Sequence, residues 1–325
     1  MSETLLVAHD LERRFGGGRT LFGRVRPAVH AVQGVDLELQ KGETLGVVGE
    51  SGCGKSTLAR MLVGLDRPSG GTIRLKDAEV SGLSGREARA LARSVQYVFQ
   101  DPVSSLNPRK TIRQILDAPM RHLLDLGEAE RAKRLDELMA AVGLRQEFLQ
   151  RYPHEFSGGQ AQRIGIARAL AADPEVIVLD EPVSALDVSV QAQVLNLLDD
   201  LKQRLGLTYV FISHDLSVVE SVSDRVAVMY FGRIVEFAPA DTLFRRPRHP
   251  YTKLLLDSAP VPGRTHVQAE AGIAELPDPY HPPPGCPFAP RCPNAEARCL
   301  SEMPELDTDR PSPDHGAACF FPIAA

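Results

Sequence analysis

The sequence predicts an α/β fold built on a parallel sheet and followed by a loop-rich C-terminal segment. From residue 1 to about residue 250, short β-rich apolar runs alternate with amphipathic helical patterns. Three of the runs end at a polar motif, which is typical of a sheet that binds a ligand at its edge. Residues 251–325 contain proline-rich stretches such as PDPYHPPPG and too little apolar content for a core of their own.

The three apolar runs are TLGVV, VIVL and TYVFIS, and they lead into Gly49, Asp180 and His214. Ligands of parallel sheets bind beyond the carboxyl ends of the strands, so we expect these three positions to lie close together. Between the last two runs, apolar residues of 194–205 recur at helical spacing up to Gly206. This pattern predicts a strand–helix–strand unit with a right-handed crossover.

Residues 104–155 are predicted to be mainly helical. Leu135, Leu138 and Val142 fall on one face, and Gly143 is a suitable stop signal. The sequence contains no internal repeat, so we expect one domain over residues 1–250, including the helical part, and a second over 251–325.

Composition and charge exclude some classes of protein. The 325 residues are 43% hydrophobic and 24% charged, with 42 acidic and 37 basic residues and a net charge of -5. This balance gives no basic footprint for nucleic acid, and we expect none as a partner. No apolar run approaches the roughly 18–20 residues of a membrane span, and the N-terminus does not resemble a secretory signal. We therefore expect a cytoplasmic protein whose membrane role is peripheral.

The segment GESGCGKST fits the pattern of a phosphate-binding loop. Its glycines allow backbone amides to approach phosphate oxygens, and the following helix points its N-terminal dipole at the same place. Lys55 supplies a cation for the β- and γ-phosphates, Ser56 a hydroxyl for Mg²⁺, and Cys53 is interpreted as a small spacer. The residues predicted to bind ATP in this loop are Gly49, Ser51, Gly52, Cys53, Gly54, Lys55, Ser56 and Thr57.

Two acids follow the VIVL run directly. Asp180 is predicted to bind ATP through Mg²⁺, and Glu181 to polarise an attacking water as a general base or an orienting acceptor. His214 follows the TYVFIS run, where we expect contact with the γ-phosphate or the water. Glu181 and His214 are the predicted catalytic residues at this edge.

FSGGQAQR, about 100 residues after the phosphate loop, resembles the signature of ATP-binding cassette (ABC) proteins. Ser157, Gly158 and Gly159 precede a helical stretch and would form a second anion site. In this family, two chains sandwich ATP head to tail. The resemblance therefore implies that Ser157, Gly158, Gly159 and Gln160 contact the ATP of a partner.

Other elements of the family occur in order over about residues 4–250. Gln100 resembles the glutamine that binds Mg²⁺ and links the site to the membrane partner, and the resemblance adds Gln100 to the predicted catalytic residues. Asp187 matches an aspartate at the dimer interface, and Phe15 the aromatic that stacks on adenine, next to an insert around residues 18–28. The resemblance implies a P-loop NTPase fold, with a RecA-like core, an antiparallel β subdomain and a helical subdomain.

QDPVSSLNPR, SVQAQVLNLL and RHPYT narrow the resemblance to ATPase subunits of oligopeptide and dipeptide importers, most like the second ATPase subunit of dipeptide permeases. This implies peptide import powered by ATP hydrolysis, with nickel or another small solute as the alternative cargo. It implies a second ATPase subunit, with a heterodimer favoured. It also implies two transmembrane permease subunits, an extracytoplasmic solute-binding protein, and a place at the cytoplasmic face of the cell membrane.

Four cysteines crowd the C-terminal segment: Cys286, Cys292, Cys299 and Cys319. Four thiolates complete a zinc site or hold a [4Fe–4S] cluster. Their spacing lacks the short pair of a zinc ribbon. It resembles the C-terminal region of peptide-importer ATPases, and this resemblance implies a [4Fe–4S] cluster, with Zn²⁺ or free thiols as the alternatives.

Two other functions remain open at this point. A non-transport ABC ATPase of DNA repair or translation would carry two cassettes, a long coiled coil or a basic arm, none of which the sequence shows. A redox-sensing or metal-delivery module would use ATP only as a regulator. The intact pair Asp180 and Glu181 favours hydrolysis over such a sensor.

Overall fold

The computed structural model describes residues 3–17, 26–82, 85–258, 276–307 and 315–323. Its strands are β1 (Thr4–Gly16), β2 (Ala28–Gln40), β3 (Thr44–Val48), β4 (Gly70–Leu75), β5 (Ala78–Glu79), β6 (Val95–Val98), β7 (Val176–Asp180), β8 (Thr208–Ile212), β9 (Arg225–Tyr230), β10 (Arg233–Pro239) and β11 (Gly316–Ala317). Its α-helices are α1 (Lys55–Leu62), α2 (Arg86–Ser94), α3 (Ile112–Pro119), α4 (Glu128–Ala141), α5 (Gly158–Leu170), α6 (Val188–Leu205), α7 (Leu216–Val222), α8 (Ala240–Arg245), α9 (Pro250–Ser258) and α10 (Ala297–Ser301). The shorter turns are η1 (Met120–Leu124), η2 (Gln146–Gln150), η3 (Pro153–Glu155) and η4 (Ala289–Arg291).

The main sheet has seven strands in the order β11-β10-β9-β3-β8-β7-β6. Strands β9, β3, β8, β7 and β6 are parallel, and β10 and β11 are antiparallel additions at one edge. Every residue of β3, β7 and β8 is buried, as expected for parallel strands covered on both faces. The three strands predicted from the apolar runs are confirmed, and they are neighbours in the order β3-β8-β7.

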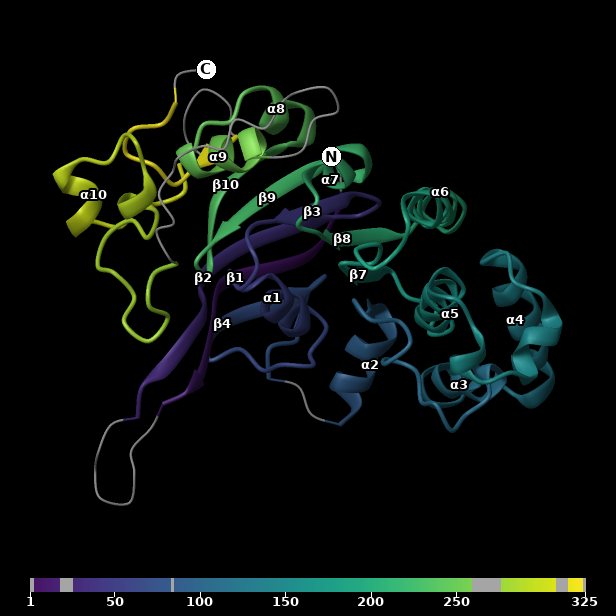
Figure 1. Cartoon of the computed structure of the whole chain (residues 1–325). Helices are drawn as coiled ribbons and strands as arrows, with labels where there is room; N and C mark the ends of the chain where they lie inside the picture. The colour runs from purple at the N-terminus through teal and green to yellow at the C-terminus, as the bar shows by residue number, and fades with distance from the viewer. Residues whose placement is uncertain (1–2, 18–25, 83–84, 259–275, 308–314, 324–325) are drawn as a thin grey trace.

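A second, antiparallel sheet has the order β2-β1-β4-β5. Its long β1–β2 hairpin extends away from the rest of the molecule in Figure 1. Leu6 of β1 and Leu37 of β2 share one apolar cluster with Leu58 of α1 and Val47 of β3. This cluster joins the second sheet to α1 and to the main sheet.

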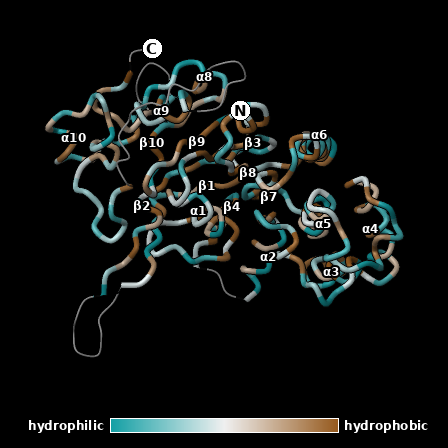
Figure 2. Tube along the Cα trace, viewed as in Figure 1, coloured by the Kyte–Doolittle hydropathy of each residue, from teal (hydrophilic) through white to brown (hydrophobic). Residues whose placement is uncertain are grey.

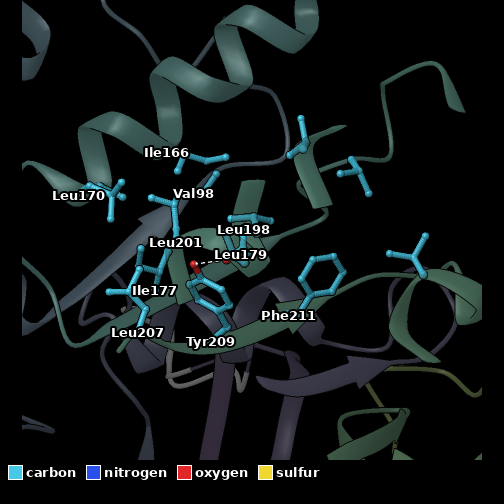
Figure 3. Packing of buried hydrophobic residues seen from close by; sticks show 14 of the residues in the cluster. Val98, Ile166, Leu170, Ile177, Leu179, Leu198, Leu201, Leu207, Tyr209 and Phe211 are labelled. Atoms are coloured by element: carbon cyan, nitrogen blue, oxygen red, sulfur yellow. Dashed lines mark hydrogen bonds between the residues drawn. The ribbon is translucent and has the colours of Figure 1, made fainter. Parts of the chain in front are cut away.

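A second cluster packs α5 and α6 against the main sheet (Figure 3). Ile166 of α5 and Leu201 of α6 lie over Ile177 of β7 in this cluster. Tyr209 of β8 donates a hydrogen bond to the carbonyl oxygen of Leu198, 3.0 Å away, so its hydroxyl is satisfied inside the core. Helix α6 ends as predicted, because Gly206 caps it in the left-handed conformation with φ 67°.

Residues 104–155 form α3, η1, α4, η2 and η3, which lie beside α5 in Figure 1. Helix α4 buries Leu135, Leu138 and Met139, and Gly143 follows its end with φ 66°. Figure 2 shows apolar residues gathered in the strands of the main sheet and hydrophilic residues along much of α4. These observations confirm the predicted helical face and stop signal.

The described parts of the C-terminal extension, residues 276–307 and 315–323, pack beside β10 and α9 (Figure 1). Its strand β11 pairs with β10, and Phe288 is only 1% exposed within the main core cluster. Glu236 of β10 is fully buried, and its carboxylate accepts hydrogen bonds from the backbone N–H groups of Arg248 and His249 and lies 2.7 Å from Nε2 of His315. The extension is loop-rich as predicted, and it is stabilised by the core of the main domain.

Candidate nucleotide site

One cavity of about 500 Å³ opens at the carboxyl ends of β3, β7 and β8. It brings together side chains that are far apart in the sequence. The predicted residues that line it are Ser51, Gly52, Gly54, Lys55, Ser56, Thr57, Gln100, Glu181 and His214. The lining residues that the sequence analysis did not identify are Val29, His30, Ala31, Phe231, Gly232 and Pro279.

The loop between β3 and α1 needs glycine for steric reasons. A Cβ atom on Gly49 would lie 2.1 Å from the carbonyl oxygen of Met229, and one on Gly54 would lie 2.2 Å from that of Ala31. Only a residue without a side chain lets the loop pass this close to the neighbouring backbone. Lys55 is 6% exposed, and its ammonium group donates to the carbonyl oxygens of Gly49 and Glu50 at 2.8 and 2.9 Å.

Asp180 at the end of β7 lies next to the loop. One carboxylate oxygen accepts a hydrogen bond from Ser56 Oγ at 3.1 Å, and the other accepts one from the Tyr97 hydroxyl at 2.5 Å. Burial and the neighbouring carboxylate raise the pKa of Tyr97, so the phenol stays a donor. Ser56 and Asp180 thus form an oxygen pair of the kind that Mg²⁺ prefers.

Glu181 has its carboxylate between two side chains. Gln100 donates to Oε2 at 3.0 Å, and Nδ1 of His214 lies 3.1 Å from Oε1. The backbone of Glu181 is in the left-handed region with φ 47°, a strained conformation that is concentrated at functional sites. A carboxylate held this way on the cavity wall is suited to orient a water and accept its proton.

The chain matches the ABC transporter family over residues 32–184 and the oligopeptide/dipeptide transporter C-terminal region over residues 235–299. It is 50% identical to the oligopeptide transport ATP-binding protein AppF of Bacillus subtilis, covering 98% of both chains. It is 51% identical to the di/tripeptide transport ATP-binding protein DppF of Pseudomonas aeruginosa, covering 94% of both. The chain belongs to the oligopeptide/dipeptide family of ABC transporter ATPases.

Solved structures agree with this family. The dimeric, post-hydrolysis structure of the ATP-binding cassette MJ0796 with ADP and Pi has a TM-score of 0.64 and 27% identity, covering 73% of this chain and 99% of that one. CbiO1 of Clostridium perfringens has the same TM-score and 28% identity, covering 75% and 91%. The predicted ABC fold and ATPase activity are thereby confirmed. No helix in the described ranges is long and apolar enough to cross a membrane.

The signature of this ABC ATPase lies outside its own cavity. Ser157 caps α5, accepting from the backbone N–H of Gln160, whose side chain accepts from the N–H of Ser157 in return. Ser157, Gly158 and Asp187 are not buried, and Asp187 caps α6 without a side-chain hydrogen bond at the cap. None of the residues predicted to reach the ATP of a partner (Ser157, Gly158, Gly159, Gln160 and Asp187) lines the cavity, and they are free to face another chain.

Phe15 and Cys53 lie beside the cavity. Phe15 is 39% exposed, and the Arg13 guanidinium lies 4.5 Å from the centroid of its ring. Phe15 does not itself line the cavity, whereas Val29, its partner across the β1–β2 hairpin, does. Residues 18–25 of the neighbouring insert lie outside the described residues. Cys53 is 2% exposed, and burial raises the pKa of its thiol, so it is neutral and well suited to be a spacer.

The four cysteines of the extension line one small cavity, together with Phe288 and His249. Burial raises the pKa of Cys286, Cys292 and Cys319, in the last case to about 11. Within the described ranges, however, no three His, Cys, Asp or Glu side chains are placed to hold a metal ion.

Among the residues that the sequence analysis missed at or near the site, Tyr97, Pro279 and Arg291 have specific contacts. Tyr97 had a usable signal, because a tyrosine in a buried strand needs a partner for its hydroxyl. Pro279 lines the cavity and accepts a hydrogen bond from the backbone N–H of His30, but its distance along the chain hides this role. Arg291 forms an ion pair with Glu50 in the phosphate-binding loop, and no local pattern indicates it.

Proposed function

We propose that this ABC ATPase subunit drives the import of dipeptides or oligopeptides by binding and hydrolysing MgATP in the cavity. The observation that carries the mechanism is the carboxylate of Glu181, held between Gln100 and His214 on the same cavity wall as Lys55. Relatives named for oligopeptide, di/tripeptide and dipeptide transport support the cargo. Nickel or another small solute is the alternative.

In this proposal the residues predicted to act on MgATP have separate roles. Lys55 and the loop amides bind the phosphates, and Ser56, Asp180 and Gln100 hold Mg²⁺ directly or through water. Glu181 orients the attacking water and accepts its proton, while His214 contacts the γ-phosphate. Mg²⁺ neutralises phosphate charge, and the enzyme contributes mainly positioning and electrostatic stabilisation.

We further propose that two ATPase subunits pair head to tail, each giving Ser157–Gly159 to the ATP of the other. The position of the signature outside its own cavity supports this pairing, as does the dimeric structure of MJ0796. The partner is a non-identical ATPase subunit, and residues 100–109 face two permease subunits at the cytoplasmic side of the membrane. A solute-binding protein outside supplies the peptide.

The test is a Glu181→Gln variant of the full-length chain within its transporter. We expect hydrolysis to fall by about 10²-fold or more, because proton transfer is lost, while equilibrium ATP binding persists. Glu220→Gln, on the exposed face of α7, is the matched control and should keep wild-type rates. Normal peptide uptake by Glu181→Gln would contradict the catalytic role of this residue.

We also propose that Cys286, Cys292, Cys299 and Cys319 hold a [4Fe–4S] cluster. The chemistry of these side chains suits a cluster, because four thiols line one cavity. Burial keeps a free thiol protonated, whereas a cysteine that binds iron does so as a thiolate. A single Zn²⁺ needs all four sulfurs about 2.3 Å from one point, whereas the corners of a cluster bind separated thiolates.

Anaerobic purification tests this proposal. We expect brown protein with broad absorption near about 400 nm and about four irons per chain. Colourless protein with one zinc per chain would contradict it.

A further inference from the structure

An ion pair joins the cysteine-bearing extension to the phosphate-binding loop. Both terminal nitrogens of Arg291 donate to the carboxylate of Glu50, at 2.9 Å to Oε2 and 2.8 Å to Oε1. The side chains are only 17% and 29% exposed, and the two residues are 241 positions apart in the sequence. Such a two-point contact fixes the direction of the carboxylate as well as its distance.

Aromatic rings of the extension and of β9 lie near the guanidinium of Arg291. The Arg291 guanidinium lies 5.7 Å from the ring centroid of Phe288 and 5.9 Å from that of Tyr230. Phe288 is 1% exposed and packs edge-on against Tyr230. Phe288 is also part of the wall of the four-cysteine cavity, so Arg291 lies between that cavity and the loop.

Glu50 itself is held at three points, through its carboxylate, its backbone N–H and its carbonyl oxygen. Its carboxylate binds Arg291, its backbone N–H donates to the Tyr251 hydroxyl at 2.9 Å, and its carbonyl oxygen accepts from Lys55 Nζ at 2.9 Å. The next residue, Ser51, already lines the nucleotide cavity. A shift of Glu50 therefore moves both the phosphate-binding lysine and the start of the loop.

We propose that Arg291 is a positioning residue for ATP: through Glu50 it holds the phosphate-binding loop in its binding conformation, so that the C-terminal extension is a working part of the nucleotide site. The inference rests on the proposed binding of ATP in the cavity. The pairing is intramolecular and does not depend on what the cysteine cavity binds. Preorganisation of this kind acts on affinity, because a loop already in place loses less freedom when the ligand binds.

The first test measures equilibrium binding of a fluorescent ATP analogue with Mg²⁺ to the full-length chain. We expect Arg291→Ala to bind the analogue about tenfold more weakly than wild type. Arg291→Lys should be intermediate, because lysine keeps the positive charge but cannot make the two-point contact of a guanidinium. The effect should appear in KM, with kcat at saturating ATP changed less than about twofold. Wild-type affinity in Arg291→Ala would overturn the proposal, whereas a wild-type chain that binds no analogue would instead refute the nucleotide site itself.

A double variant separates positioning from charge. Removing Arg291 also unmasks the negative carboxylate of Glu50, which would repel phosphates through space. If charge alone acts, Glu50→Gln together with Arg291→Ala restores affinity, and this result would refute the positioning role. If Arg291 positions the loop, the double variant binds ATP about as weakly as Arg291→Ala, because the side chain of residue 50 still lacks the guanidinium that holds it in place.

Arg225 provides the matched control. It also forms a two-point pair with a carboxylate, donating from Nε and Nη2 to Glu43 at 2.8 and 2.6 Å. Glu43 lies just before the start of β3, whereas Glu50 lies beyond its end. Arg225→Ala should lower stability in urea about as much as Arg291→Ala while changing ATP affinity less than about twofold. An equal loss of affinity in both variants would assign Arg291 a general structural role and overturn the proposal.

Discussion

At the scale of single residues, the Tyr97 hydroxyl orients the carboxylate on which the proposed Mg²⁺ site depends. Tyr97→Phe leaves one oxygen of the buried Asp180 without its 2.5 Å hydrogen bond. We expect the free energy of unfolding to fall by about 2 kcal/mol, since the bond is made to a buried, charged acceptor. The Mg²⁺ concentration for half-maximal hydrolysis should rise severalfold. Urea unfolding and a Mg²⁺ titration of ATPase activity measure the two effects.

Tyr152→Phe is the control for this change, because Tyr152 is 41% exposed and does not line the cavity. Its stability should stay within about 0.5 kcal/mol of wild type. Equal stability of the two variants would mean that the Tyr97 hydroxyl does not support Asp180.

At the scale of elements, two helices begin with the same capping box and differ in what lies beyond it. Ser157 caps α5 and Thr111 caps α3, and each hydroxyl accepts a hydrogen bond from a backbone N–H at 3.4 Å. In each box, the side-chain oxygen of a glutamine accepts a hydrogen bond from the backbone N–H of the capping residue. Ser157→Ala and Thr111→Ala should each lower the free energy of unfolding by about 1 kcal/mol. Only Ser157→Ala should also reduce hydrolysis in the assembled transporter, because its hydroxyl faces the ATP of the partner in our proposal.

The comparison is made by urea unfolding and by ATPase assays at matched subunit concentrations. A drop in hydrolysis of the same size in both variants would assign the effect to helix capping alone and contradict the signature role of Ser157.

At the scale of the whole molecule, the packing of the extension makes stability depend on pH. Burial lowers the pKa of His249 to about 4 from its usual 6.5, although Glu236 opposes the shift. The folded chain therefore binds this proton less readily than the unfolded chain. Its stability is fully present above pH 6.5 and falls as the pH drops towards 4, by about 2 kcal/mol between pH 7 and pH 5.

His249→Asn tests this dependence. The asparagine oxygen can replace Nδ1 as the acceptor for the backbone N–H of Tyr251 but does not titrate. Urea unfolding at the two pH values should show a flatter dependence in the variant, with the carboxylate of Glu236 and the imidazole of His315 left in place. An unchanged slope would mean that other groups carry the pH dependence.

The sequence predicted most of the fold and much of the site because those features are local. β3, β7 and β8 are continuous apolar runs, and the loop from Gly49 to Thr57 carries its function in its own backbone. The assignment of Phe15 to adenine stays a prediction, since the cavity is lined by Val29 across the hairpin.

The sequence by itself determined the buried strands, the phosphate loop and the acids at the strand ends, because apolar spacing and glycine placement act within a few residues. Its ordered motifs carried the resemblance to the ABC family. Only the tertiary structure decided that Tyr97 supports Asp180, that Pro279 lines the nucleotide cavity, and that Arg291 holds Glu50. The Tyr97–Asp180 and Arg291–Glu50 contacts join residues 83 and 241 positions apart, and the hydrogen bond from His30 to Pro279 spans a similar distance along the chain. They depend on how two sheets and a loop-rich extension pack, and no local sequence pattern identifies the partners in these contacts.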